Sequence, residues 1–131
     1  MEALTLKEIA KALNTKTDFD VQINNVCIDT RKITKGCLFI CIKGERFDAH
    51  QFANEALSLG AAAVMISEDI EVNGAFVKVE NTSKALLDLS AYYRSKFNIP
   101  VVALTGSVGK TTTKEFTYLV VNSEFNAIRT Q

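Results

Sequence analysis

The sequence predicts an α/β fold, because short apolar strands and amphipathic helices alternate along the whole chain. Residues 37–42 and 101–105 are almost continuously apolar, as expected of strands that are buried on both faces of a parallel sheet. Residues 82–98 and 110–121 instead repeat their apolar side chains every three or four positions, which is the helical period. Alternation of these two kinds of element is typical of the α/β class.

The composition bounds the kind of protein. A chain of 131 residues with 47% hydrophobic and 23% charged residues is ordinary for one globular domain, or for one domain and part of another. The formal net charge is zero, so nothing global favours a nucleic-acid partner. Apolar runs stay shorter than the roughly 18 residues of a membrane span, and the N-terminus lacks the pattern of a signal peptide. We therefore expect a cytoplasmic protein without a membrane partner.

The three cysteines, Cys27, Cys37 and Cys41, form no Cys-x-x-Cys pair and are odd in number. This argues against a disulfide framework and against a zinc knuckle. We expect them to be small buried hydrophobic residues.

The first elements are defined by a cap, a change of phase and a turn. Thr5 is placed to cap a helix that runs to about Asn14. Residues 21–29 alternate and then shift phase, which predicts one strand with a bulge or two short strands. Lys35-Gly36 is a turn before the buried strand 37–42.

The middle of the chain predicts one helix and two strands. A helix over residues 51–58 ends before Gly60, a usual position for a left-handed residue. Strands over 62–66 and 75–79 then flank an acidic loop at 67–74.

A longer helix, capped by Asn81 or Ser83, runs to about Phe97 and ends before Pro100. We expect its inward side chains to be Leu86, Leu87, Ser90, Tyr93 and Phe97. Beyond it we expect a strand at 101–105, a helix at 110–121 and the start of a strand at 125–128.

A domain boundary is expected in the long helix, dividing the chain into residues 1–82 and 83–131. The second part holds only one strand–loop–helix unit, which cannot close a parallel sheet because both faces of its strand need covering. The chain therefore looks truncated. We expect the apolar faces of residues 100–131 to self-associate, or to stay mobile.

Residues 105–112, Thr-Gly-Ser-Val-Gly-Lys-Thr-Thr, lie between a predicted strand and a predicted helix. Gly109, Lys110 and Thr111 match the end of the general phosphate-loop pattern, but Leu104 stands where that pattern has its first glycine. The alternative is a glycine-rich turn with a chance lysine.

The physical requirements of a phosphate loop are met nonetheless. Gly106 and Gly109 allow backbone N–H groups to approach phosphate oxygens, and the helix that follows directs its positive end at them. Lys110 can reach the β- and γ-phosphates of ATP, and the Thr111 hydroxyl can hold Mg²⁺. The predicted ATP-binding residues are Thr105, Gly106, Ser107, Val108, Gly109, Lys110, Thr111 and Thr112.

A second polar region flanks the buried strand 37–42. Residues 31–46 carry five basic side chains against the single acid Glu45. The basic residues are Arg31, Lys32, Lys35, Lys43 and Arg46. Such a patch suits a diphosphate, although solvated turns beside a strand would have the same composition. His50, the only histidine, is a candidate to contact a ligand or simply a residue at the start of a helix.

The order of these pieces resembles the Mur ligases of peptidoglycan synthesis. The resemblance rests on Thr30-Arg31-Lys32, Gly36-Cys37-Leu38-Phe39, Lys43-Gly-Glu-Arg-Phe-Asp-Ala-His50, Gly60-Ala61-Ala62 and the loop 105–111. It implies that residues 1–82 form a small mixed α/β domain that holds the UDP end of the substrate. The substrate-binding positions that it implies are Thr30, Arg31, Asp48, Ala49 and His50. Residues 83–131 would be a linker helix and the start of the ATP-binding central domain.

The resemblance also implies a reaction. An intact enzyme of this kind, expected to be a monomer, joins D-Ala-D-Ala to UDP-N-acetylmuramoyl-tripeptide through an acyl phosphate, with ATP and Mg²⁺. Lys110 and Thr111 would be its catalytic residues here, with Mg²⁺ on the Thr111 hydroxyl. Thr113-Lys114-Glu115 favours this branch of the family over the branch that adds the third amino acid. Family members have three domains, so we expect this chain alone to be inactive.

Two other readings remain open. A different phosphate-loop protein, such as a small kinase or a switch NTPase, would share the loop at 105–112. A non-catalytic module that binds a UDP-sugar peptide would share residues 1–82.

Overall fold

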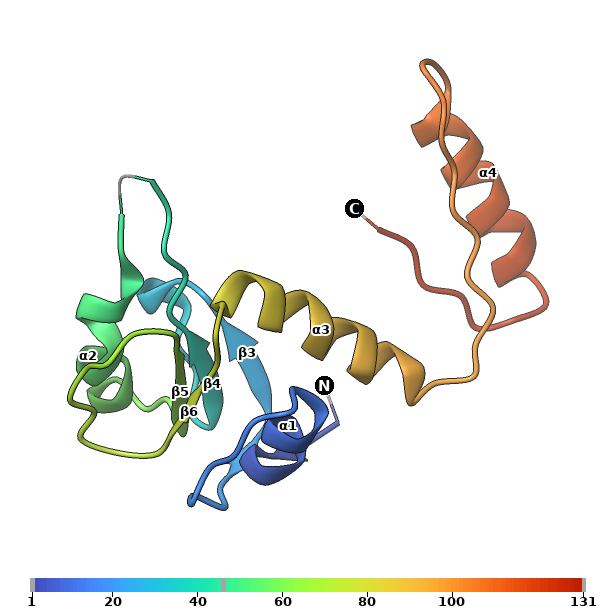
Figure 1. The fold of residues 1–131 in the computed structure, drawn as a ribbon. Coiled ribbons are helices and arrows are strands. Elements are labelled where there is room, and N and C mark those ends of the chain that lie inside the picture. The colour runs from blue at the N-terminus through green and yellow to red at the C-terminus, as the bar shows by residue number, and fades with distance from the viewer. Residues whose placement is uncertain (1, 46, 131) are drawn as a thin grey trace. The chain divides into compact units, whose positions relative to one another are not determined.

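A computed structural model describes residues 2–45 and 47–130, which form two compact units (Figure 1). One unit ends at Phe97 and the other begins at Asn98. The α/β class predicted from the sequence is confirmed.

The first unit is built on a parallel sheet of four strands in the order β3-β4-β5-β6. The strands are β3 (Asn25–Cys27), β4 (Cys37–Ile40), β5 (Ala63–Ile66) and β6 (Phe76–Lys78). Every residue of the central strands β4 and β5 is buried, as the continuous apolar run at 37–42 predicted. Phe39 pairs with Cys27 on one side and with Val64 on the other.

Residues 21–29 form two short strands, so the second of the two sequence alternatives is confirmed. β2 (Gln22–Ile23) pairs in antiparallel fashion with β1 (Leu4–Thr5), and β3 then joins the parallel sheet. Gly36 makes this change of sheet possible. Its carbonyl accepts from Asn24 N–H at 2.9 Å, its φ is +83°, and a Cβ there would lie 2.7 Å from the Asn24 side-chain nitrogen.

Helices cover both faces of this sheet. Alternate strand residues such as Leu38 and Met65 pack with α1 (Leu6–Ala12) and α3 (Thr82–Ser95) on one face. Phe39 and Val64 pack on the other face with α2 (Ala53–Ser58), which follows the short 3₁₀ helix η2 (Ala49–Phe52). The three cysteines are buried and free, as predicted.

The predicted helix caps are present. The Thr5 hydroxyl accepts from Glu8 N–H at 3.1 Å. Within α1, Leu6, Ile9 and Ala10 are buried. Asn81, rather than Ser83, caps α3 by accepting from Lys84 N–H at 2.9 Å.

The predicted inward face of α3 was partly wrong. Leu87 is 71% exposed and Ser90 is also exposed, whereas Thr82, Ala85 and Leu89 are buried. A hydrogen bond explains the rotation, because the buried Thr82 hydroxyl donates to the Cys41 carbonyl at 2.8 Å. That contact turns Ala85 and Leu89, one and two turns further on, toward the sheet.

An ionic contact ties α3 to α1. Glu8 Oε1 accepts from the Tyr92 hydroxyl and from Lys96 Nζ, each at 2.7 Å. The hydrogen bond from Lys96 is the largest cause of the lowered pKa of Glu8. Since α3 packs on the first unit, the two compact units divide after Phe97, and the division into domains at residues 1–82 and 83–131 stays a prediction.

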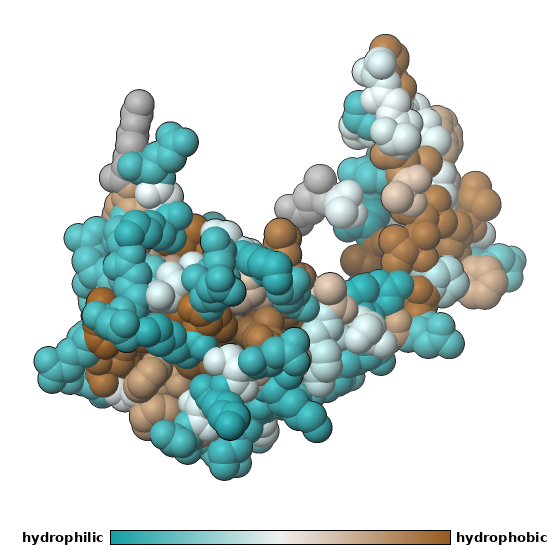
Figure 2. Space-filling view, in the orientation of Figure 1, coloured by the Kyte–Doolittle hydropathy of each residue, from teal (hydrophilic) through white to brown (hydrophobic). Residues whose placement is uncertain are grey.

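The second unit contains α4 (Lys110–Asn122), which confirms the predicted helix. The predicted strands at 101–105 and 125–128 are absent, because no described residue of this unit pairs with either segment and a strand needs a neighbouring strand. Figure 2 shows apolar side chains gathered on the surface of this unit. They include Val101, Val102, Phe116, Leu119, Val120, Phe125 and Ile128. No described helix is both long and apolar enough to cross a membrane.

Replacing the buried hydroxyl at the start of α3 tests this account of its rotation. Thr82→Val keeps the side-chain volume but removes the donor to the Cys41 carbonyl. We expect the free energy of unfolding to fall by about 1–2 kcal/mol, measured by urea denaturation. The matched substitution at the exposed Thr34, Thr34→Val, should change it by less than about 0.5 kcal/mol. Equal effects of the two substitutions would contradict the account.

Candidate functional site

The motif residues of the first unit gather where its parallel strands end. Asp29 to Arg31 follow β3, Asp48 to His50 follow the loop after β4, and Ser67-Glu68 follow β5. Because parallel strands end at one edge of a sheet, these segments share that side of the unit, here called the carboxyl edge. Ligands of open α/β sheets usually bind outside the carboxyl ends of the strands.

After β3 the chain makes a 3₁₀ turn, η1 (Thr30–Lys32), that Asp29 caps. Asp29 Oδ1 accepts from Arg31 N–H at 3.0 Å, and its carboxylate also receives the Arg31 guanidinium in a fork, with Nε–Oδ1 at 2.9 Å and Nη2–Oδ2 at 2.7 Å. The guanidinium and this backbone bond hold the pKa of Asp29 at about 2. The Arg31 side chain, 86% exposed, is thereby fixed in orientation while it still faces solvent.

After β4 the same arrangement recurs around Asp48, which caps η2. Asp48 Oδ1 accepts from His50 N–H at 2.9 Å and lies 2.6 Å from His50 Nδ1. These bonds to His50 lower the pKa of Asp48. In both turns an aspartate caps the turn and also fixes the side chain two positions later. The shared spacing Asp-x-Arg and Asp-x-His carried this signal in the sequence, but sequence reasoning missed it.

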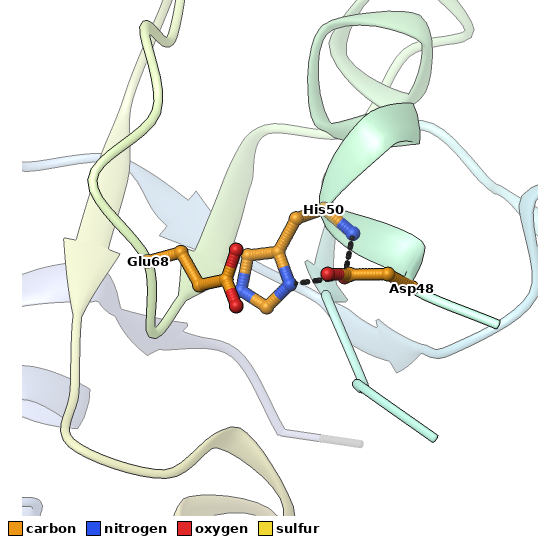
Figure 3. A group of neighbouring side chains, drawn as sticks. All are labelled: Asp48, His50 and Glu68. Atoms are coloured by element: carbon orange, nitrogen blue, oxygen red, sulfur yellow. Dashed lines mark hydrogen bonds and ion pairs between the residues drawn. The ribbon is translucent and has the colours of Figure 1, made fainter. Parts of the chain in front are cut away.

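His50 is buried, with its side chain 3% exposed, and both of its ring nitrogens are engaged. Figure 3 shows the contacts of its backbone N–H and of Nδ1 with Asp48. Nε2 accepts from Ser67 N–H at 2.9 Å. A backbone N–H only donates, so Nε2 carries the lone pair and Nδ1–H donates to Asp48, as the hydrogen-bond network assigns it. The imidazole therefore links η2 to the end of β5, and it offers no free nitrogen to a ligand.

Asp48, His50 and Ser67 stand in the order of a carboxylate–imidazole–hydroxyl triad, with Ser67 Oγ 3.2 Å from Nε2. The resemblance to a hydrolase triad is superficial. The single lone pair of Nε2 already accepts the Ser67 backbone N–H at the shorter distance of 2.9 Å. The hydroxyl is therefore not activated as a nucleophile, because activation requires that lone pair.

Asp48, His50 and Glu68 offer ligand atoms within 4.8 Å of one another, a spacing that could suit a metal ion. The chemistry of the donors argues otherwise. Lys43 Nζ forms an ion pair with Glu68 and lies 3.8 Å from Asp48 Oδ2, so an ammonium already contacts both carboxylates. The ring nitrogens of His50 are also occupied, which leaves the group without a nitrogen ligand for a metal.

The other sequence-predicted residues of this region differ in what they can offer. The Thr30 hydroxyl is half-buried and makes no hydrogen bond among the described residues, so it is free to donate or accept. Ala49 is buried and contributes packing and backbone only. Phe47 is 57% exposed and stacks on Phe52 at 5.4 Å between ring centroids. Arg46 lies outside the described residues.

The predicted phosphate loop lies in the second unit. Gly109, at φ +79°, precedes α4, and Gly106 has φ +152°, so both glycines adopt backbone conformations that side chains disfavour. All residues from Thr105 to Thr112 are exposed, and Lys110 Nζ donates to the Gly106 carbonyl across the loop. The two glycine conformations and the helix after them are as the sequence predicted, whereas the strand predicted before the loop is absent from the described residues.

An open groove of about 890 Å³ lies between the end of α1, β6 and α3. Lys84 pairs with Asp88 at 3.2 Å and Lys78 with Asp69, whereas Glu80 forms no ion pair among the described residues. The groove is lined by Ser67 after β5 and by Lys78, Val79 and Glu80 at the carboxyl end of β6, but none of the motif residues after β3 and β4 lines it.

Comparisons with known proteins identify the family of this chain. The curated ligases that the chain resembles include the UDP-N-acetylmuramoyl-tripeptide–D-alanyl-D-alanine ligase of Escherichia coli, 40% identical over 99% of this chain and 29% of the relative. The UDP-N-acetylmuramoyl-L-alanyl-D-glutamate–2,6-diaminopimelate ligase of Clostridioides difficile is also 40% identical, over 76% of this chain and 21% of the relative. The chain thus spans less than a third of the length of these relatives.

The chain also resembles solved structures of ligases from the same family. A crystal structure of MurF from Acinetobacter baumannii superposes with a TM-score of 0.86 at 32% identity, over 95% of this chain and 28% of that one. MurF ligase from Thermotoga maritima in complex with ADP superposes with a TM-score of 0.69 at 33% identity, over 77% of this chain and 24% of that one. The family described as "Mur ligase family, catalytic domain" matches residues 22–105. This chain belongs to the Mur ligase family.

Proposed function

We propose that the chain is the N-terminal part of an ATP-dependent ligase that joins D-Ala-D-Ala to UDP-N-acetylmuramoyl-tripeptide. The proposal is carried by 40% identity over 99% of the chain to a relative named for this activity, and it is supported by two separate features of the chain itself. These features are the carboxyl edge with its two aspartate-capped turns and the phosphate loop that begins α4. A cytoplasmic location is part of the same proposal.

In the proposed reaction, the terminal carboxylate of the tripeptide attacks the γ-phosphorus of ATP and releases ADP. The amine of D-Ala-D-Ala then attacks the acyl phosphate, forming the amide and releasing inorganic phosphate. Catalysis of phosphoryl transfer consists mainly of positioning and of neutralising charge. Lys110 is suited to neutralise the γ-phosphate, and the amides of residues 106–111 to bind the phosphate oxygens.

The Thr111 hydroxyl fits the role of a Mg²⁺ ligand. It is exposed in the first turn of α4, beside Lys110, and makes no hydrogen bond among the described residues. When bound there, Mg²⁺ would offset negative charge on the phosphates.

In the same proposal the carboxyl edge holds the UDP end of the muramoyl substrate. Arg31 presents an oriented guanidinium to the phosphates, and Thr30 a free hydroxyl. Asp48 and His50 position the loop after β4, and Ala49 lets η2 pack closely on the sheet.

Two further candidate functions each have a supporting observation. The similarity to the diaminopimelate ligase of Clostridioides difficile supports a ligase that adds the third amino acid. Thr113-Lys114-Glu115 and the name of the Escherichia coli relative favour the D-Ala-D-Ala activity over it. The containment of the whole carboxyl edge in the first unit supports a module that binds a UDP-sugar peptide without turnover. Self-association through residues 100–131 remains part of that second candidate.

A chimera tests the reaction. This chain replaces the matching N-terminal segment of the Escherichia coli ligase, and ADP release is measured. We expect ADP only when UDP-N-acetylmuramoyl-tripeptide and D-Ala-D-Ala are both present. Lys110→Met should lower kcat about 10²- to 10³-fold, the usual loss when one electrostatic stabiliser is removed. The nearby Lys114→Met serves as control and should cost less than about tenfold.

Other outcomes of that assay would contradict the proposal. ADP release without any peptide substrate indicates a kinase or a switch NTPase. ADP release that requires the muramoyl dipeptide and a free diamino acid indicates the ligase that adds the third residue.

The roles assigned to Arg31 and His50 predict opposite patterns of loss. Arg31→Ala should leave the free energy of unfolding nearly unchanged and weaken binding of UDP-N-acetylmuramoyl-tripeptide about tenfold or more, measured by calorimetry. His50→Ala leaves the Ser67 N–H without its partner and should lower the free energy of unfolding by about 1–3 kcal/mol. If His50→Ala kept full stability and lost binding, His50 would be a direct ligand contact instead.

A further inference from the structure

Two carboxylates of the carboxyl edge each pair with a motif cation, Asp29 with Arg31 and Glu68 with Lys43. We propose that they act with opposite sign on binding of a nucleoside diphosphate. Asp29 strengthens binding because it orients Arg31, whereas Glu68 weakens binding because it competes with the diphosphate for Lys43. The inference rests on the proposed function, which brings a UDP-linked substrate to this edge.

Asp29 orients Arg31 but leaves part of its guanidinium available to a ligand. A guanidinium has five N–H donors, and the fork to Asp29 engages only Nε and Nη2. Nη1 therefore stays available, on a side chain that is 86% exposed. A free arginine loses much rotamer freedom when it binds a ligand, and the fork removes that freedom beforehand. The Asp29 cap on η1 also fixes the backbone from which Arg31 projects.

Glu68 holds Lys43 in a different way. The lysine ammonium is a compact point charge with three rotatable donors, so a carboxylate beside it offsets the charge that would attract a phosphate. Glu68 follows β5, and its carboxylate pairs with Lys43 at the start of the loop after β4. There the backbone of Lys43 forms an isolated antiparallel β-bridge with Asp48. Glu68 and the more distant Asp48 are the only acidic side chains paired with Lys43 among the described residues.

The pair is accessible and of modest strength. Lys43 is 58% exposed and Glu68 is 38% exposed, so solvent screens their attraction, and a diphosphate of higher charge can displace the carboxylate. Glu68 is the main cause of the raised pKa of Lys43, so the ammonium stays charged and able to receive the phosphate. Lys43 is therefore a binding residue whose positive charge is partly offset by Glu68 in the free protein.

The test measures the dissociation constant of UDP for the 131-residue chain by calorimetry at low salt. Glu68→Gln keeps the side-chain shape and should tighten binding about two- to fivefold, the range expected for an exposed ion pair. Asp29→Asn keeps a good cap for η1 and removes only the charge, yet it should weaken binding about two- to fivefold. The gain from Glu68→Gln should shrink in about 1 M salt, where screening is strong.

Two controls separate competition at Lys43 from a general charge effect. Asp69→Asn removes a negative charge at the neighbouring position, from a carboxylate that is 96% exposed and paired with Lys78, and should leave the dissociation constant unchanged. In a Lys43→Ala background the gain from Glu68→Gln should vanish, because the two residues then no longer couple. A gain that persists in this background overturns the inference.

The remaining outcomes also decide the matter. If UDP binds the unaltered chain and Glu68→Gln leaves its affinity unchanged, the inference is overturned and the proposed function stands. If Asp29→Asn tightens binding, its orienting role is overturned. If UDP does not bind the unaltered chain at millimolar concentration, the inference is overturned together with the proposed UDP site, while the chimera still tests the ligase reaction.

Discussion

The hydrogen bond from Ser67 N–H to His50 Nε2 is the contact on which the geometry of the carboxyl edge depends. It joins the loop after β4 to the end of β5, two segments that are 17 residues apart. With Nε2 engaged, Nδ1–H must point to Asp48, whose carboxylate then also caps η2. The same junction brings the foot of the Lys43 loop against Glu68. One buried imidazole thereby holds Asp48 and the end of β5 in place beside Lys43 and Glu68, whereas Asp29 fixes Arg31 separately.

The parallel sheet supplies the frame for that contact. Its two central strands are buried on both faces, so their own side chains are apolar, and polar side chains can only follow the strand ends. Polar residues therefore appear where the strands stop. The turns after β3 and β4 use the same device, an aspartate that caps a 3₁₀ turn and fixes the side chain two residues later. In η1 the fixed side chain is the exposed cation of Arg31, and in η2 it is the buried imidazole of His50.

Features that depend on neighbouring residues in the chain were predictable from the sequence. The buried strand at 37–42, the Thr5 and Asn81 caps and the helix after the phosphate loop all have local causes. The inward face of α3 was not predictable, because it depends on a hydrogen bond to Cys41, 41 residues away. The segment 101–105 has strand-like composition, but none of the described residues forms a partner strand for it. His50 drew attention as the only histidine, but its burial and its bond to Ser67 come from tertiary structure.

The central claim is that the carboxyl edge, and not the phosphate loop or the groove beside α3, holds the UDP end of the muramoyl substrate. Titration of the ¹⁵N-labelled chain with UDP-N-acetylmuramoyl-tripeptide, followed by amide chemical shifts, tests this claim most directly. The account predicts shifts concentrated at residues 30–32, 43–50 and 67–68, with residues 105–112 unchanged. Shifts confined to residues 105–112, or to residues 78–88 along the groove, would contradict it.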